Sequence, residues 1–201
     1  DTASVAARLS REAVEAGPSS IWRYAAVLPA SPGPGDLAPG LTPLVPAPRL
    51  AEALGVPGPL LLKDDTRNPT NSFKDRVVAV AVARARAFGL TTVACASTGN
   101  LAGATAAAAA AQGLDCVVVI PADLEAGKVA SAAAFGATVV AVEGSYDQAN
   151  RLSMQAVEAF GWGFVNVNLR PWYAEGSKTV GLEVAEQLGW SLPEHVVVVG
   201  F

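Results

Sequence analysis

The sequence predicts an α/β fold in which parallel sheets carry helices on both faces. Three observations support this fold class. Apolar residues make up 51% of the 201 positions, which is enough for a sizeable core. From residue 91 onward, continuously apolar runs with strand character alternate with helix-like segments, as in sheets buried on both faces. Glycines suited to closing helices stand near the expected helix ends, at Gly89, Gly113, Gly136 and Gly161.

The first part of the chain contains less regular elements. Proline and glycine residues at 31–35 interrupt any helix or strand and predict a loop. The apolar run at 60–63 predicts a strand, and a polar turn follows it. A helix is expected at 73–87, with Ser72 as its cap and Gly89 after its last turn.

The predicted elements alternate regularly from residue 91. We expect strands at 91–96, 115–120, 138–142 and 164–167, separated by helices at 101–111, 128–135 and 146–160. A helix at 177–188 then leads into the apolar run 196–199, which predicts another buried strand. Ligands gather at the carboxyl ends of such strands, and the sequence stops at Phe201, directly after this one. We therefore expect a fragment whose carboxy-terminal part is missing.

Composition narrows the classes of function. The net charge is −4 and the basic residues are scattered, so no nucleic-acid partner is expected. No apolar run is long enough to cross a bilayer, and residues 1–10 lack a secretory pattern, so we expect no membrane contact and a cytoplasmic location. Cys95 and Cys116 stand inside strand-like runs and are interpreted as buried hydrophobic residues. His195 is the only histidine, so we expect no metal site, and chemistry here requires a cofactor.

A lysine at the start of a helix is the first candidate for chemistry. Lys74 follows the polar turn at 68–72, where the helix dipole disfavours an ammonium and favours the free amine that reacts with an aldehyde. Phe73 could pack on a flat ring, and Asp75 and Arg76 could form a supporting ion pair. The alternatives are a surface lysine on a first turn and two ordinary helix-surface charges.

The second candidate is Ser97-Thr98-Gly99-Asn100, which follows a predicted strand and opens a predicted helix. Unpaired backbone N–H groups point outward at such a junction, hydroxyls add donors, and Gly99 lets an anion approach the backbone. This pattern predicts a cradle for a carboxylate or phosphate. The same residue types also cap helices without binding any ligand, and capping alone is the alternative explanation.

Together the two segments resemble the fold-type II pyridoxal-phosphate enzymes, which carry an SFKDR-like segment and an S-x-G-N loop. Within that group, segments 41–44, 68–76, 96–100 and 175–179 are similar, in the same order, to the threonine synthase family. The resemblance runs from about residue 41 to 201. It implies a larger domain that begins in 1–88 with an amino-terminal extension, a small α/β domain at 89–170, and a return to the larger domain at 171–201.

The resemblance also implies roles for individual residues. Lys74 would form the Schiff base to pyridoxal 5′-phosphate and shuttle protons, Phe73 would lie against the pyridine ring, and Asn100 would bond the ring hydroxyl. The substrate carboxylate would be bound by Ser97, Thr98, Gly99 and Asn100. Groups that recognise the substrate phosphate are expected among Asn166, Asn168, Arg170, Lys178 and Thr179. The alternatives are that Arg170 forms an ion pair with a neighbouring acidic residue and that Lys178 is an ordinary surface residue at a helix start.

The activity that the resemblance implies is the conversion of O-phosphohomoserine and water into threonine and phosphate, by a carbon–oxygen lyase. The alternatives are another fold-type II enzyme, such as a threonine or serine dehydratase or a cysteate synthase-like enzyme, and a non-catalytic binding protein of the same fold. A small amino-acid substrate is implied as partner, and a homodimer is left open. The sequence departs from the family at Asn71, where many relatives carry glycine. The glycine-rich loop for the cofactor phosphate and the partner of the pyridine nitrogen are expected beyond Phe201.

Overall fold

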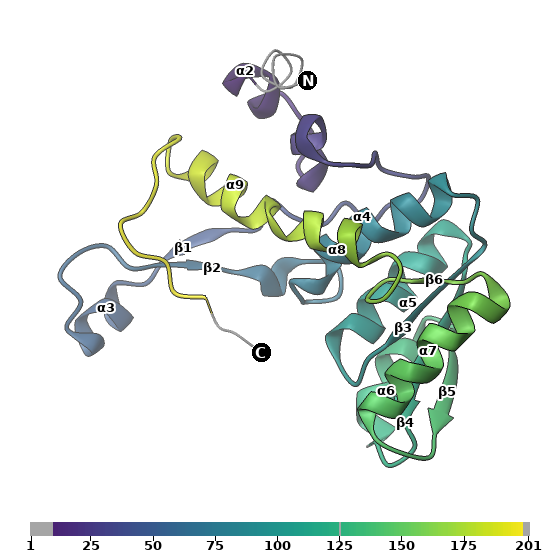
Figure 1. Ribbon diagram of the computed structural model, residues 1–201. Coiled ribbons are helices and arrows are strands. Elements are labelled where there is room, and N and C mark those ends of the chain that lie inside the picture. Colours follow the sequence, from purple (N-terminus) through teal and green to yellow (C-terminus); the bar gives the residue numbers. More distant parts are fainter. Residues whose placement is uncertain (1–9, 125, 199–201) are drawn as a thin grey trace.

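The computed structural model describes residues 10–124 and 126–198 (Figure 1). A short antiparallel pair of strands and a parallel sheet are joined by helices that pack on one another. In chain order the elements are α2 (Arg11–Glu15), η1 (Ile21–Val27), β1 (Leu44–Pro46), α3 (Pro48–Leu54), β2 (Leu61–Lys63), η2 (Asp65–Arg67), α4 (Lys74–Ala87), β3 (Thr92–Ala96), α5 (Asn100–Gln112), β4 (Asp115–Pro121), α6 (Ala126–Ala134), β5 (Thr138–Val142), α7 (Tyr146–Phe160), β6 (Gly163–Phe164), α8 (Arg170–Ser177) and α9 (Thr179–Gln187).

The parallel sheet confirms the predicted fold class. Its strand order is β5-β4-β3-β6, and each neighbouring pair is parallel. Side chains from alternate positions of β3 enter different cores. Val93 and Cys95 pack toward α4 and α5, while Ala94 and Ala96 pack in the core that includes Ala149 of α7. Burial on both faces explains why these strands are continuously apolar.

The antiparallel pair lies at the other end of the molecule. β1 pairs with β2 in a register that sets Leu44 opposite Lys63. Figure 1 shows this pair away from the parallel sheet, with α4 between the two regions. β2 leads through η2 directly into the loop that precedes α4.

α4 is the central helix, and η1, α5 and α8 all pack on it. Ile21 and Trp22 of η1 pack against Ala79 and Val80 in a core of their own. α8 crosses α4 so closely that a Cβ on Gly176 would lie 2.6 Å from the carbonyl oxygen of Arg76. Only a residue without a side chain fits there. The amino-terminal segment therefore packs against α4 through η1.

Several expectations are confirmed closely. The helices predicted around 73–87, 101–111 and 146–160 match α4, α5 and α7, and the strand at 138–142 matches β5. The four glycines at the expected helix ends all have positive φ. Asn71 also takes a left-handed conformation, with φ 58°. A short polar side chain tolerates this conformation better than most, so Asn71 can occupy a turn in which glycine would otherwise be favoured.

Two expectations near the carboxyl end are wrong, while the helix expected at 177–188 is confirmed as α9 (Thr179–Gln187) and follows an unexpected helix, α8. β6 has two residues in place of four, because the chain turns after Phe164. Helix begins at Arg170, where Pro171 occupies the first turn, and it divides at Lys178 into α8 and α9. Residues 196–198 form no strand and are 68%, 93% and 80% exposed, since no described strand pairs with them. Val199 lies outside the described residues. None of the described helices is long and apolar enough to cross a membrane.

Candidate functional site

The loop before α4 is held by side chains that bond to backbone groups. Asn68 accepts a hydrogen bond from the Gly40 amide at 2.9 Å. The Asp75 carboxylate accepts from the backbone N–H of Thr70 at 2.8 Å and from its hydroxyl at 2.7 Å. Ser72 Oγ accepts from the Lys74 amide at 3.1 Å, although the N-cap residue of α4 is Phe73 and not the predicted Ser72. The loop therefore delivers the chain to Lys74 in a defined conformation.

Lys74 is the first residue of α4 and is half-buried. Its Nζ lies 5.9 Å from the centroid of the Phe73 ring, which packs against the main core. Among the described residues, the amine has no ion-pair or hydrogen-bond partner. It is therefore available for a reaction, unlike Lys63 and Lys178, which form ion pairs.

Asp75 and Arg76 do not form the ion pair that the sequence suggested. They point to different partners because adjacent residues of a helix lie on different faces. Asp75 closes the loop at Thr70. Arg76 is fully buried and pairs with Asp65 at 2.7 Å and with Glu183. The alternative of surface charges is equally wrong, since Asp75 is only 5% exposed.

The second candidate segment lies at the carboxyl end of β3. Ser97 is buried, and its Oγ accepts a hydrogen bond from the Gly99 amide at 3.2 Å. α5 begins at Asn100 without a side-chain cap, and no atom lies within 4 Å of the position that a Cβ on Gly99 would take. Simple capping therefore does not explain these residues. The uncapped first turn of α5 and the open space beside Gly99 suit an anion.

Two side chains from other elements hold the residue before this segment. Asn166 exchanges two hydrogen bonds with the Ala96 backbone, at 3.3 Å to the N–H and 3.1 Å to the carbonyl oxygen. The Tyr146 hydroxyl donates to the same carbonyl at 3.1 Å. The sequence analysis placed Asn166 among the phosphate-recognising groups and did not single out Tyr146. Only the fold brings the start of α7 to the end of β3.

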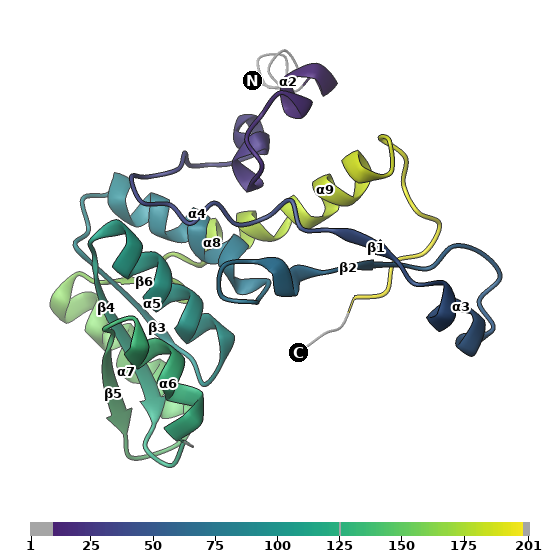
Figure 2. The same ribbon diagram turned by 180° about the vertical axis from the view of Figure 1, so that it is seen from behind.

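The amino ends of α4 and α5 lie on the same side of the molecule. The two helices pack side by side, and Figure 2 shows both beginning at the same end of the pair. Lys74 and the segment 97–100 are therefore presented in the same direction. The sequence predicted each of them separately, and the packing of α4 on α5 brings the two helix starts to the same side of the molecule.

The remaining candidates are mostly engaged within the protein. Asn168 accepts from the Phe164 amide at 2.7 Å and donates to the Trp162 carbonyl at 3.1 Å. Lys178 forms an exposed ion pair with Glu175. Thr179 is buried and donates to the Gly176 carbonyl at 2.8 Å. Arg170 is exposed at the first residue of α8. Among these four, Arg170 is the one whose side chain has no hydrogen-bond or ion-pair partner among the described residues.

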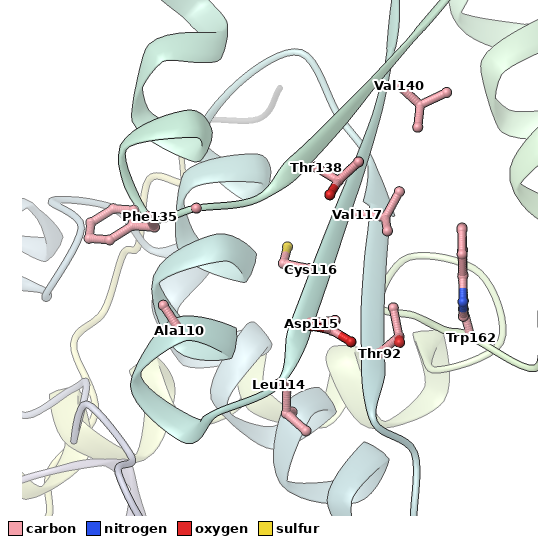
Figure 3. Close-up of a pocket in the computed structure, with 11 residues that line it drawn as sticks. Thr92, Ala110, Leu114, Asp115, Cys116, Val117, Phe135, Thr138, Val140 and Trp162 are labelled. Carbon is pink, nitrogen blue, oxygen red and sulfur yellow. The ribbon is translucent and has the colours of Figure 1, made fainter.

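A cavity of about 360 Å³ lies at the opposite edge of the parallel sheet (Figure 3). Its lining includes the first residues of β3, β4 and β5, which are Thr92, Asp115 and Thr138. The segment 97–100 follows the other end of β3. The cavity is therefore separate from the candidate site.

The two cysteines are free and buried, as expected. Burial raises the pKa of the Cys95 thiol and that of the Cys116 thiol to about 12. Both stay protonated near neutral pH, and a thiol is a far weaker nucleophile than a thiolate. Neither cysteine is therefore a candidate nucleophile near neutral pH.

The fold and the paired amino ends define the class of protein. A family model described as "Pyridoxal-phosphate dependent enzyme" matches residues 35–200, and the chain belongs to this family. Solved structures with the same fold include diaminopropionate ammonia lyase from Escherichia coli, at 26% identity and a TM-score of 0.66. That match covers 74% of this chain and 48% of that one. A threonine deaminase from Solanum lycopersicum matches at 26% identity with a TM-score of 0.65, over 73% of this chain and 40% of that one.

Relatives in sequence point to one branch of the family. Threonine synthase of Methanosarcina acetivorans is 41% identical over 89% of this chain and 44% of its own length. Threonine synthase of Methanocaldococcus jannaschii is 36% identical over 95% of this chain and 47% of its own length. The chain thus spans just under half the length of these relatives.

The residues present fit the cofactor that gives the family its name. The Lys74 amine has no competing partner in the described part of the chain, and the Phe73 ring beside it is half-buried. Open space beside Gly99 adjoins the uncapped start of α5. A pyridoxal-phosphate enzyme needs a free amine, a surface for a flat ring and donors for anionic groups, and this site offers all three.

Proposed function

We propose that the full-length protein is a threonine synthase that converts O-phosphohomoserine and water into threonine and phosphate. The observation that carries the proposal is a lysine amine without a partner among the described residues, on the same side of the molecule as an uncapped helix start, in a chain 41% identical to a threonine synthase. The substrate of this reaction carries an anionic group at each end, so it needs two separate sets of donors.

Each part of the site has a role in this proposal. Pyridoxal phosphate, when bound, supplies an electron sink for negative charge at the substrate Cα. Lys74 attaches the cofactor and, once released, its amine moves protons to and from substrate carbon. The backbone N–H groups at 98–100 and the hydroxyls of Ser97 and Thr98 bind and orient the substrate carboxylate, for which the Gly99 N–H must leave Ser97 Oγ, its present partner at 3.2 Å. Asn100 bonds the ring hydroxyl of the cofactor, and Phe73 supports the ring.

The substrate phosphate requires cationic or amide groups on another part of the site. We propose Arg170 as the first of these, because its side chain is exposed at the start of α8. Asn168 and Lys178 would contribute only if they left their present partners, Phe164 and Glu175. Stabilising phosphate as it leaves is a large electrostatic contribution in such a reaction.

We further propose that the chain contributes to two domains. The parallel sheet lies entirely within 89–170, which supports a small α/β domain there. α8 packs on α4, which supports a return of 171–201 to the larger domain that begins in 1–88.

A deaminase or lyase of the same fold is the second candidate function. The structural similarity to a threonine deaminase and to an ammonia lyase favours it. These enzymes would use the same lysine and carboxylate cradle without a site for substrate phosphate.

Purified full-length protein with pyridoxal phosphate tests the two candidates. Phosphate release from O-phosphohomoserine, accompanied by threonine, is the expected result. Ammonia release from threonine or serine, without phosphate release, would establish the second candidate instead. A protein that develops no visible absorbance with the cofactor would contradict both and favour a non-catalytic binding protein.

A further inference from the structure

A cluster of charged side chains surrounds Arg76, which lies two residues after Lys74 on α4. Arg76 and Glu183 are both 0% exposed, and they bond through both ends of the carboxylate, with Arg76 Nη2 2.8 Å from Glu183 Oε2. Asp65 receives the other edge of the guanidinium, at 3.0 Å from Nε and 2.7 Å from Nη2. Arg76 is thus held by two carboxylates in paired geometry, the strongest that a guanidinium can form.

Neighbouring groups satisfy the rest of the cluster. Lys63 lies 2.7 Å from Glu183 and donates to the Thr42 carbonyl at 2.7 Å. The Thr42 hydroxyl accepts from Arg76 at 2.9 Å and donates to Asp65 at 2.7 Å. Two cations therefore face two carboxylates. A buried cluster that is balanced in charge and fully bonded holds one geometry, because any displacement would leave a buried charge unpaired.

The cluster joins parts of the chain that are distant in sequence. Arg76 and Glu183 are 107 residues apart, on α4 and α9. Lys63 comes from β2 and Asp65 from η2. The Leu41 amide also donates to Glu183 at 2.8 Å. The charged cluster thus joins four parts of the chain: the segment before β1, the end of β2, α4 and α9.

The first turn of α4 connects the charged cluster to the candidate site, because it carries both Arg76 and Lys74. Arg76 lies two residues after Lys74 and is anchored to Asp65, nine residues before Lys74. Asp75, between them, is anchored to Thr70. The loop 65–73 and the first turn of α4 are therefore bonded to each other on both sides of Lys74. A shift of Arg76 would move the backbone that carries the amine.

We propose that Arg76, Asp65 and Glu183 are positioning residues for Lys74, fixing the first turn of α4 so that its amine meets the cofactor aldehyde. They do not touch substrate or cofactor, and they act through the backbone of one helical turn. This inference rests on the role proposed above for Lys74. It adds the groups that hold that lysine, among which Glu183 comes from a distant helix.

Glu183→Gln tests the inference, and Glu186→Gln is its matched control. Both residues lie on α9 and both are ion-paired. Glu186 bonds to Arg23 and Tyr24 of the amino-terminal segment and makes no contact with Arg76 among the described residues. Each substitution removes one charge of a largely buried pair and keeps the size of the side chain. The two differ in whether the lost charge holds Arg76.

The measurement is the rate at which pyridoxal phosphate attaches to Lys74 in the full-length protein. It is followed by visible absorbance and by borohydride trapping with mass analysis of the Lys74 peptide. Experiments are run well below the unfolding midpoint of each variant, so the folded fraction is equal. Glu183→Gln should slow attachment roughly tenfold or more, since displacements near 1 Å cost up to about 100-fold in such reactions. Glu186→Gln should lower the unfolding midpoint and leave the rate unchanged.

A milder variant covers the case in which Glu183→Gln does not fold. Thr42→Val removes only the hydroxyl that links Arg76 to Asp65. It should slow attachment by a smaller factor, with the trapped label still on Lys74. Equal attachment rates in wild type, Thr42→Val and any folded Glu183→Gln would overturn the positioning role. Wild-type protein that traps no label on Lys74 would instead refute the proposed function, so the two failures are distinguishable.

Discussion

The amino ends of α4 and α5 differ in how many of their polar groups are bonded within the protein. The start of α4 is held by hydrogen bonds, from the Lys74 amide to Ser72 and from Arg76 to the carboxylates of Asp65 and Glu183. The start of α5 has a glycine before it, no side-chain cap and open space beside it. A group that forms a covalent bond must be held in place, whereas a group that receives a diffusing anion must be left unsatisfied until the anion arrives. The difference between the two ends matches these two tasks.

Removing the amine at the held end should have the largest effect. Lys74→Ala should abolish covalent attachment of the cofactor and turnover, because no other group replaces the reacting nitrogen. Absorbance, borohydride trapping and product formation measure this loss. Lys74→Arg keeps a cation at the helix start but cannot form the same bond, so it should fail equally. Turnover that persists in either variant would remove Lys74 from the mechanism.

Adding a side chain before the start of α5 should weaken substrate binding more than it lowers the stability of the fold. Gly99→Ala places a methyl group where the structure has no atom within 4 Å, so the folded chain accepts it. The same methyl would keep a carboxylate from the amides of α5. We expect KM to rise roughly 10- to 100-fold, equivalent to losing a charged hydrogen bond of about 1.5–3 kcal/mol. The unfolding midpoint should stay near wild type, and an unchanged KM would argue against the cradle.

A substitution at Gly176, which packs against the start of α4, should lower stability more than it affects substrate binding. A Cβ on Gly176 would lie 2.6 Å from the Arg76 carbonyl, so Gly176→Ala must displace α8 from α4. Overpacking of this kind costs about 1–3 kcal/mol of unfolding free energy. Denaturant unfolding measures it. Gly181→Ala on α9, where no atom lies within 4 Å, is the control that should leave stability nearly unchanged.

Low pH should lower the stability of the protein, because it protonates the carboxylates that hold Arg76 at the start of α4. Burial alone would raise the pKa of Glu183 and that of Asp65, but hydrogen bonds from Arg76 outweigh it and hold both below their ordinary values of 4.5 and 3.8. Such groups stabilise the fold above those values, and this stability is lost as the pH falls through the lowered pKa. The unfolding free energy, measured from pH 6 downward, should decline once the pH falls below about 4.5, the ordinary pKa of a glutamate.

A control isolates the contribution of Glu183 to this decline. Burial raises the pKa of Asp75, so its contribution runs in the opposite direction and partly offsets the loss. Glu183→Gln should flatten the acid limb of the stability curve. If the variant keeps the full acid dependence of wild type, Glu183 does not stabilise the fold through its charge.

The smallest effect is expected at Arg170, which belongs to neither helix start. Arg170→Ala removes one exposed cation, so KM for the phosphorylated substrate should rise about two- to fivefold, the usual worth of an exposed ion pair. Cofactor loading should not change. Equal losses in loading and in KM would place Arg170 in the scaffold and not in phosphate recognition.

Local pattern in the sequence determined much of this protein. The period of the apolar residues placed α4, α5, α7 and β5 within a residue or so, because burial on a helix face or on both faces of a sheet leaves that period in the chain. The motifs at 68–76 and 97–100 identified both helix starts that form the candidate site. These features depend on neighbours within a few residues, and a sequence displays such neighbours directly.

The tertiary structure decided which distant groups meet. Arg76 looked like a partner for Asp75, yet its partners are Asp65 and Glu183, because docking of α9 brings in a carboxylate 107 residues away. Tyr146 and Asn166 reach Ala96 only because α7 and the turn after β6 flank β3. The valines at 196–198 show the same limit, since a strand exists only when another strand pairs with it. Pairing between distant segments depends on how the elements dock, and residue type alone does not encode it.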